Sequence, residues 1–102
     1  MSSSPFPKPS PLVVLHNAAE SRFETTVDGF LAVADYRLEG ANVVFTHTFV
    51  TGELRGRGIA ENLVRAGLAW ARAEKRSVVP ACSYVDVFIQ RHAEFQDLLA
   101  SR

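Results

Sequence analysis

The sequence predicts a mixed α/β (α+β) domain, with an antiparallel meander of about four strands, a crossover helix, a fifth strand and a C-terminal helix. Three observations favour this class. Short runs of alternating apolar and polar residues fill the first half of the chain, a longer stretch with helical spacing follows them, and a short apolar run comes next. With 102 residues, 47% of them apolar, the chain is long enough to bury one core. We expect one domain, over 12–102.

The first eleven residues differ from the rest in composition. Residues 1–11 contain four prolines and four serines, which remove backbone donors and leave little to bury, so we predict a disordered tail there. The tail lacks the apolar centre of a signal peptide, and no later stretch has the roughly 18 apolar residues that span a bilayer. The single cysteine, Cys82, favours a reducing compartment. We therefore expect a cytoplasmic protein with no membrane partner.

Turn residues divide the first half of the chain into four predicted strands. Asp28-Gly29 stands between two alternating runs, and glycine there accepts the positive φ of a tight hairpin turn. Residues 39–42 give a second, looser turn signal. The predicted strands are 12–16, 22–27, 30–38 and 43–50.

The fourth predicted strand is apolar on both sides. With regular alternation, Val43, Phe45, His47 and Phe49 share one face, and the residues between them share the other. Neither face is strongly polar, so we expect this strand to lie inside the sheet rather than at its edge.

Two helical stretches and one more strand are predicted in the second half. Apolar residues recur at helical spacing over 58–75, where alanines add helix propensity. The apolar run 77–82 is predicted to be a fifth strand parallel to the fourth, because a strand–helix–strand unit closes as a right-handed crossover. A second amphipathic helix is predicted over 85–99, bent near His92.

Pro80 stands within the predicted fifth strand. Proline has no N–H to donate to a sheet ladder, so pairing with the fourth strand is expected to stop there and the two strands to splay apart. Unpaired backbone groups would then face a cleft that an extended, amide-bearing molecule can enter as a pseudo-strand. The alternative is that Pro80 merely ends an edge strand, and the local sequence does not decide between the two.

The segment ELRGRGIA, residues 53–60, joins the fourth strand to the first helix. Glycines at such a junction leave backbone N–H groups exposed, and the positive end of a helix attracts phosphate. Arg55 and Arg57 strengthen the attraction. The alternative is a plain turn with solvated arginines. The segment lacks the Gly-Lys-Ser/Thr ending of a Walker loop and the third glycine of a dinucleotide fingerprint.

Residues 50–60 resemble the acetyl-CoA loop of the GNAT acyltransferases, whose motif is Arg/Gln-x-x-Gly-x-Gly/Ala, with Arg55, Gly58 and Ala60 as the matching residues. Further short motifs, spread over nearly the whole chain after the tail, resemble a minimal, single-domain branch of that superfamily. The resemblance implies a GNAT-like mixed sheet with a splayed fifth strand. The motifs are HN at 16–17, RFE at 22–24, YR at 36–37, FTHT at 45–48, GRGIAENLV at 56–64, VPACSYV at 79–85 and RHAEF at 91–95.

The resemblance also implies a cofactor, acetyl-CoA or coenzyme A. The loop amides would hold its pyrophosphate, and the end of the fourth strand would hydrogen-bond its pantetheine arm. Removing a charge by Arg57→Ala is then expected to weaken coenzyme binding. The implied cofactor-binding residues are Thr48, Phe49, Val50, Arg55, Gly56, Arg57, Gly58, Ile59 and Ala60.

His47 and Cys82 are the candidates for chemistry. An imidazole at position 47 would take a proton from an amine at neutral pH, or else it is a core residue between two phenylalanines. Cys82 precedes the segment 83–86, whose Ser-x-x-Asp pattern is typical of a helix start. A thiol against that helix end would act as a nucleophile or proton relay. The alternative is a small buried residue that closes the strand.

In the minimal branch, the residues that match His47 and Cys82 are the proposed catalytic pair. Direct attack by an amine and an acetyl-cysteine route both remain open. Many GNAT enzymes also place a tyrosine after the fifth strand to protonate the departing thiolate. The nearest residues here are Tyr84 and Phe88, so that acid is unassigned. The branch often has proline where this chain has Ala93.

The function implied by the resemblance is transfer of an acetyl group from acetyl-CoA to an amine, either a protein lysine or amino terminus or a small amine. The alternatives are a coenzyme A or acyl-CoA binding module without efficient transfer, and an interaction domain whose glycine loop is only a turn. Eleven basic residues balance eleven acidic ones, so no nucleic-acid partner is expected. No His, Cys and carboxylate group has metal-ligand spacing, so no metal is expected. We expect a monomer or weak dimer.

Overall fold

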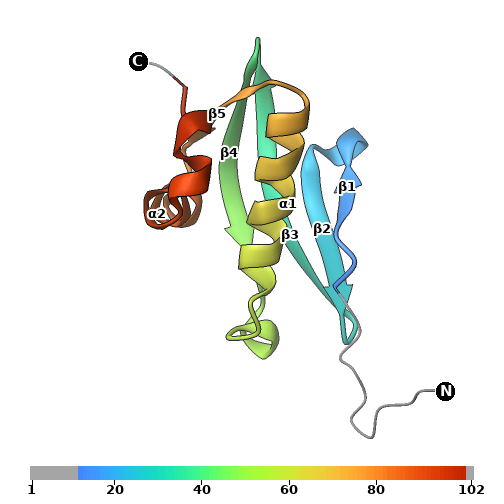
Figure 1. Cartoon of the computed structure of the whole chain (residues 1–102). Helices are drawn as coiled ribbons and strands as arrows, with labels where there is room; N and C mark the ends of the chain where they lie inside the picture. The colour runs from blue at the N-terminus through green and yellow to red at the C-terminus, as the bar shows by residue number, and fades with distance from the viewer. Residues whose placement is uncertain (1–11, 101–102) are drawn as a thin grey trace, which may run out of the picture.

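The described residues, 12–100, form a five-stranded mixed sheet in the computed structural model, with the strands in chain order. Figure 1 shows α1 lying across one face of the sheet and α2 beside β5. The predicted sheet, crossover helix and C-terminal helix are confirmed, while the predicted tail at 1–11 lies outside the described residues. The elements, with η for 3-10 helices, are β1 (Leu15–Asn17), η1 (Ala18–Glu20), β2 (Arg22–Val27), β3 (Phe30–Glu39), β4 (Asn42–Phe49), η2 (Gly52–Leu54), α1 (Ile59–Ala73), β5 (Ser77–Pro80), α2 (Ser83–Arg91) and η3 (Ala93–Leu98).

Two tight turns join the central hairpins. Asp28 and Gly29 both have positive φ, +53° and +82°, as the primed turn predicted between β2 and β3 requires. Between β3 and β4, Glu39 pairs directly with Asn42, which leaves a turn of only two residues. This second turn is therefore tighter than the sequence suggests, and Gly40 supplies its positive φ of +59°.

The first strand is shorter than predicted. The sequence suggests 12–16, whereas β1 pairs with β2 only from Leu15 onward. Just before it, the hydroxyl of Thr25 donates a hydrogen bond to the carbonyl of Val13 at 2.8 Å. Because a side chain takes this carbonyl, the segment lies against β2 without forming a ladder.

One extra residue interrupts the pairing of β4 with β3. Tyr36 pairs with Phe45 and Asp35 pairs with His47, so Thr46 has no partner and forms a β-bulge. Directly opposed residues share a face of the sheet. His47 therefore shares the face of Asp35, and Phe45 shares the opposite face with Tyr36.

The bulge overturns the regular alternation predicted for this strand. The Tyr36 ring lies 5.1 Å from the Trp70 ring of α1, which places the Phe45 side of the sheet under the helix. His47 and Phe49 lie on the other side and are exposed. The prediction that Phe45, His47 and Phe49 share a face is wrong, because Thr46 shifts the pleat by one residue. β4 is nevertheless an interior strand, as predicted, with β3 on one side and β5 on the other.

The fifth strand separates from β4 at Pro80. The two strands pair in parallel from Asn42–Ser77 to Phe45–Pro80, and the Cys82 N–H then donates to the Phe45 carbonyl at 2.8 Å. Four residues of β4, Thr46 to Phe49, continue past the last β5 partner. The predicted splay is thus present, and it begins at the same point as the β-bulge.

Helix α1 packs closely on the sheet through a glycine. A Cβ built on Gly67 would lie 2.8 Å from Cε1 of Phe45, so no larger residue fits without displacing that ring. The buried side chains of the helix include Leu63, Val64 and Leu68. This contact holds the middle of α1 against the middle of β4.

The predicted bend in the last helical stretch is a complete break. Helix α2 ends at Arg91, His92 adopts an extended backbone with φ of −130°, and η3 follows. Arg72 of α1 holds η3 in place through two hydrogen bonds to the Asp97 carboxylate, at 2.9 and 3.0 Å. Within residues 12–100, no helix combines the length and the hydrophobicity that crossing a membrane requires.

Candidate functional site

A 3-10 helix and two glycines shape the loop between β4 and α1. Leu54 is 1% exposed and anchors η2 in the core. Gly56 and Gly58 then adopt φ of +83° and +74°, where a side chain would be strained. The backbone therefore turns back sharply and leads directly into α1.

The first turn of α1 has backbone N–H groups that no side-chain cap satisfies. Its N-cap is Gly58, which offers no side chain to accept them. Asn62 donates to the Gly58 carbonyl from both its backbone and its side chain, at 3.1 and 2.8 Å, and so caps nothing. Within the described residues, the N–H groups of Ile59, Ala60 and Glu61 find no acceptor outside the helix. Together with the positive end of the helix, these N–H groups offer a surface that suits an anion.

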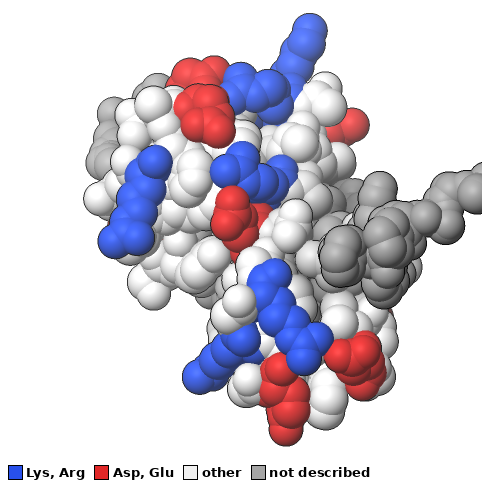
Figure 2. Space-filling model, turned by 60° about the horizontal axis from the view of Figure 1, so that its bottom comes forward, with Lys and Arg blue, Asp and Glu red and all other residues white. Residues whose placement is uncertain are grey.

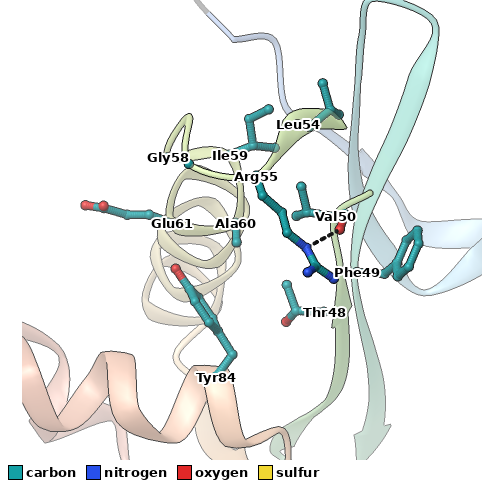
Figure 3. Close-up of a pocket in the computed structure, with 11 residues that line it drawn as sticks. Thr48, Phe49, Val50, Leu54, Arg55, Gly58, Ile59, Ala60, Glu61 and Tyr84 are labelled. Carbon is teal, nitrogen blue, oxygen red and sulfur yellow. Dashed lines mark hydrogen bonds between the residues drawn. The ribbon is translucent and has the colours of Figure 1, made fainter. Parts of the chain in front are cut away.

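These amides open onto a cavity of about 440 Å³ between the end of β4, the glycine loop and the start of α2 (Figure 3). Cofactor sites commonly have volumes of this order. Of the cofactor-binding residues expected from the sequence, all except Arg57 line it. The ring of Phe49 points away from the cavity in Figure 3, so Phe49 contributes its backbone. The lining residues are Thr48, Phe49, Val50, Leu54, Arg55, Gly56, Gly58, Ile59, Ala60, Glu61 and Tyr84.

The two arginines of the loop have different surroundings. The Arg55 side chain crosses the cavity, and its Nε donates to the Val50 carbonyl at 3.4 Å (Figure 3). No carboxylate within residues 12–100 pairs with it. Arg57 instead reaches the β2–β3 turn, where its Nη1 lies 2.9 Å from Oδ2 of Asp28. Arg55 is thus the loop cation that faces the cavity.

Cys82 lies at the point where β5 leaves β4. Its Sγ is 3.5 Å from the hydroxyl oxygen of Thr48, on the face of the sheet that α1 covers. Cys82 is also the N-cap residue of α2, so the helix starts one residue earlier than the Ser83 cap predicted from the sequence. The thiol is half-buried and lies beside the helix start, as predicted.

His47 lies on the other side of the sheet from this thiol. It pairs with Asp35 beyond the bulge and is exposed, so it is not the core residue that the alternative reading of the sequence suggests. Its ring stacks on the Phe49 ring, with centroids 6.5 Å apart. The structure therefore does not bring the two predicted catalytic side chains into contact. They are neighbours only through the backbone of β4, at its exposed end.

Tyr84 lines the cavity, and no role could be assigned to it from the sequence. It stands in the first turn of α2, and Figure 3 shows its hydroxyl pointing toward the start of α1. Burial raises the pKa of this hydroxyl, and the nearby Glu61 carboxylate raises it further. Tyr84 is therefore a protonated donor at neutral pH. The helix start predicted at 83 could have identified it, because a residue in that turn must lie near the end of the splay.

Charges of both signs are interspersed at this end of the molecule. Figure 2 shows basic and acidic side chains side by side around the loop end, with no broad region of one sign. The pairs Arg57–Asp28 and Arg65–Glu61 account for part of this balance. Among residues 12–100, no three His, Cys, Asp or Glu side chains gather as a metal site.

The sequence and the fold both resemble those of known proteins. A family profile described as GCN5-related N-acetyl-transferase matches residues 22–98. The chain therefore belongs to the GCN5-related N-acetyltransferase (GNAT) family, as its motifs suggest. It is also similar to the solution NMR structure of a GCN5-like protein from Staphylococcus aureus, described as a proposed N-acetyltransferase. The two share 25% sequence identity and a TM-score of 0.72, over 91% of this chain and 92% of that one.

Proposed function

We propose that this chain is an acetyl-CoA-dependent enzyme that moves an acetyl group to an amine, either a protein lysine or amino terminus or a small amine. One observation carries the proposal: unpaired amides at the start of α1 face a cavity that continues along the part of β4 left free by β5. We further propose that it works in the cytoplasm as a monomer or weak dimer. The single cysteine supports that compartment.

The residues present fit the coenzyme. The amides from Gly56 to Glu61 and the guanidinium of Arg55 would hold the diphosphate, since charge-assisted hydrogen bonds to phosphate are the strong ones. The exposed backbone of β4, over 46–50, would pair with the amide-bearing arm as a strand does. When bound, acetyl-CoA supplies an acyl carbon that is already activated as a thioester.

The side chains around the splay have complementary roles in the transfer. His47 would accept the proton that the attacking amine loses as its nitrogen bonds to the acyl carbon. Tyr84 would donate its proton to the sulfur as the carbon–sulfur bond breaks, and solvent would restore it. Alternatively, the Cys82 sulfur would attack the acyl carbon, and coenzyme A would leave as its thiol as the carbon–sulfur bond breaks. The amine would then attack the acetyl-cysteine, give its proton to His47 and release the Cys82 sulfur. Thr48 would orient the thiol in that route.

A second candidate function is a coenzyme A or acyl-CoA binding module with little or no transferase activity. The position of His47 favours it, because the imidazole lies on the opposite face from the Thr48–Cys82 pair. In a binding module, nothing requires these side chains to meet. Coenzyme binding is common to both functions, and turnover separates them.

Thermal unfolding with coenzyme A tests the shared step. A ligand that binds only the folded state at a hundredfold excess over its Kd stabilises it by about 2.7 kcal/mol, which raises the Tm of a domain of this size by well over 5 °C. ATP at the same concentration is the control for nonspecific phosphate binding. A Tm that coenzyme A leaves unchanged would exclude both functions.

Mass spectrometry with acetyl-CoA and a panel of amines tests the transfer. Acetylated amine is the expected product, and acetyl bound to Cys82 in the absence of amine would support the two-step route. Cys82→Ala and His47→Ala should keep coenzyme affinity and lower the transfer rate. If wild-type protein binds coenzyme A but acetylates neither amines nor itself, the binding module is the correct function.

A further inference from the structure

The face of the sheet turned away from α1 carries a patch of side chains near the free end of β4. Asp35 lies directly opposite His47 there, and Val33 lies directly opposite Phe49. Directly opposed residues share a face, and Leu31 shares it with Val33 because these residues are two apart on one strand. We call this set the open patch; its residues are Leu31, Val33, Asp35, His47 and Phe49.

No helix of residues 12–100 covers the open patch. The buried side chains of α1, α2 and η3 belong to one core cluster, which lies on the other side of the sheet with Ala34 and Tyr36. Leu31 and Phe49 are 40% and 47% exposed, and Val33 between them is half-buried. A single exposed apolar residue is ordinary, whereas adjacent ones beside a polar pair are a feature of interaction surfaces.

Asp35 gives the open patch a negative charge. Arg22 lies opposite Asp35 on β2, but its Nε donates to Oε1 of Glu24 at 2.7 Å. The amide of Asn17 also donates to this oxygen, at 3.3 Å, so Glu24 is the carboxylate that Arg22 neutralises. The Asp35 carboxylate forms no ion pair with any of residues 12–100. It therefore complements a cation, such as the ammonium form of an amine.

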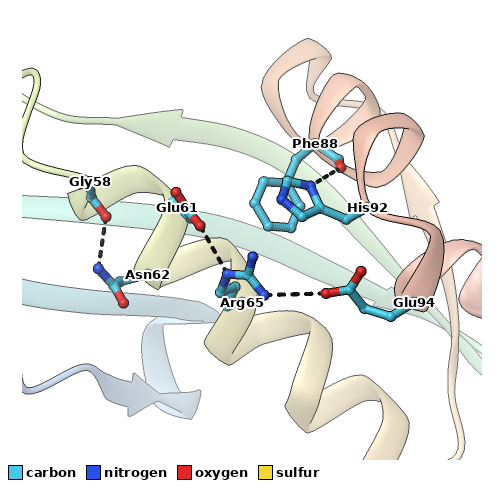
Figure 4. Close-up of polar contacts among 7 residues, drawn as sticks. All are labelled: Gly58, Glu61, Asn62, Arg65, Phe88, His92 and Glu94. Carbon is cyan, nitrogen blue, oxygen red and sulfur yellow. Dashed lines mark hydrogen bonds and ion pairs between the residues drawn. The ribbon is translucent and has the colours of Figure 1, made fainter.

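On the side of the sheet that α1 covers, Arg65 ties the helices together. Its Nε lies 3.0 Å from Oε2 of Glu61, and its Nη1 lies 3.6 Å from Oε2 of Glu94 in η3 (Figure 4). The guanidinium also lies over the ring of Phe88 in α2, 5.3 Å from the centroid. The proposed coenzyme would fill the cavity at the end of these helices. The open patch is free of both, and it reaches the edge of β4 that β5 leaves unpaired.

We infer that the open patch is the acceptor surface, and that its acceptor is the lysine side chain of a protein segment with apolar residues next to the lysine. Asp35 holds the ammonium group beside His47. Leu31, Val33 and Phe49 pack against the apolar neighbours of the lysine. Small ligands usually bind in concave sites, whereas these apolar side chains are spread over an exposed sheet face. This inference rests on the proposed function and adds the class of acceptor to it.

The test compares two blocked peptides as acceptors, one with lysine between two leucines and one with lysine between two serines. Wild-type protein with acetyl-CoA should acetylate the leucine peptide with a kcat/KM about tenfold higher, because leucine gains more than serine on leaving water. Leu31→Thr should lose most of this preference through KM and keep its affinity for coenzyme A. Val87→Thr, which removes an apolar side chain that is 44% exposed on α2, is the matched control and should keep the preference.

Asp35→Asn tests the charge separately from the apolar contacts. It should raise the KM of both peptides about fivefold and leave their ratio unchanged, because both carry the same lysine. Glu39→Gln, which removes an exposed carboxylate at the other end of β3, is the control and should change neither KM. A Tm that rises with coenzyme A shows that each variant is folded.

Four outcomes would overturn the inference while the proposed function stands. The two peptides could be acetylated equally well, or blocked lysine alone could be as good an acceptor as the leucine peptide. Val87→Thr rather than Leu31→Thr could raise the KM, which would place the acceptor beside α2. A wild-type dimer in sedimentation that Leu31→Thr dissociates would assign the open patch to a second copy of the chain. If coenzyme A binds and no amine is acetylated, the proposed transfer fails together with the inference.

Discussion

Arg55 and Arg57 show how two residues of one motif can differ in what they contact. Both flank Gly56 and both carry charge, so the sequence treats them alike. In the structure only Arg55 crosses the cavity, while Arg57 forms an ion pair with Asp28, in which the two side chains are 49% and 67% exposed. The structure therefore indicates that Arg55 is better placed than Arg57 to contact a ligand in the cavity, a difference that the motif does not show.

We predict that Arg55→Ala weakens coenzyme A binding about tenfold or more. It removes from the proposed diphosphate site a cation that no carboxylate within residues 12–100 pairs with, and a hydrogen bond to a charged group contributes about 1.5–3 kcal/mol. Arg57→Ala, expected from the sequence to weaken binding, should do so less, because an exposed ion pair contributes about 1 kcal/mol at most. Calorimetric titration of the two variants at one salt concentration measures both effects. A larger loss in Arg57→Ala would reverse the assignment.

At the residue scale, the sequence predicted the glycine loop between the fourth strand and the first helix. It did not predict on which face of the sheet each nearby side chain lies. Gly56 and Gly58 could be recognised because their φ values demand glycine. The face of His47 could not be predicted, because it depends on the Thr46 bulge, and a bulge is defined by the register of the partner strand. No role could be assigned to Tyr84 from the sequence, because its position in the cavity depends on how α2 packs in the folded chain.

At the element scale, the C-terminus of α1 is closed by a residue that is rarely found in its conformation. Arg76 N–H donates to the Ala71 carbonyl at 2.9 Å and Lys75 N–H to the Arg72 carbonyl at 3.1 Å, which is the pattern of a Schellman motif. Lys75 has a φ of +57°, where glycine is usual. A side chain in that region is strained by about 1–2 kcal/mol.

Lys75→Gly should therefore stabilise the protein by about 0.5–1 kcal/mol. The gain is the relief of left-handed strain less the greater entropy of glycine in the unfolded chain. Thermal or urea unfolding measures it. Lys75→Ala is the control, since alanine keeps the strain, and it should leave the stability unchanged or lower. Equal stabilities for the glycine and alanine variants would argue against strain at this position.

Most helices and strands could be predicted from the sequence, and two features could not. Hairpins, the crossover helix and the break near His92 all leave marks in local composition or spacing. The short 3-10 helix η2 did not, because three residues carry no period. The start of β1 was predicted too early, because the hydroxyl of Thr25 donates to the Val13 carbonyl. The alternation of apolar and polar residues does not reveal such side-chain hydrogen bonds.

At the scale of the whole molecule, an aromatic cluster far from the splay joins the first strands to α1. The Nε2 of His16 and the hydroxyl of Tyr36 are 2.6 Å apart, and the imidazole stacks on Phe23 at 4.3 Å and meets the edge of Trp70 at 4.7 Å. Burial lowers the pKa of His16 from its usual 6.5, and the Glu74 carboxylate opposes the shift in part. The fold thus favours the neutral imidazole.

The stability of the domain should therefore fall as the pH drops below about 6.5. In that range the unfolded chain takes up a proton that the folded His16 resists, so acid favours unfolding, and the contribution is fully present only above pH 6.5. Urea unfolding at pH 7.5 and pH 5.5 measures the difference. His16→Gln, which does not titrate, should reduce it. An unchanged pH dependence in that variant would show that the slope arises elsewhere.

Thr46, which has no partner on β3, offsets the alternation of side chains along β4 by one residue. Deleting Thr46 would restore a continuous ladder in which His47 still opposes Asp35 and Thr48 still opposes Ala34, so the later side chains of β4 would keep their faces. The Thr48 hydroxyl would stay on the side of the Cys82 thiol, while the strand would lose the local bend that a bulge produces. We therefore expect the protein to keep the arrangement of His47 and Thr48 without this residue.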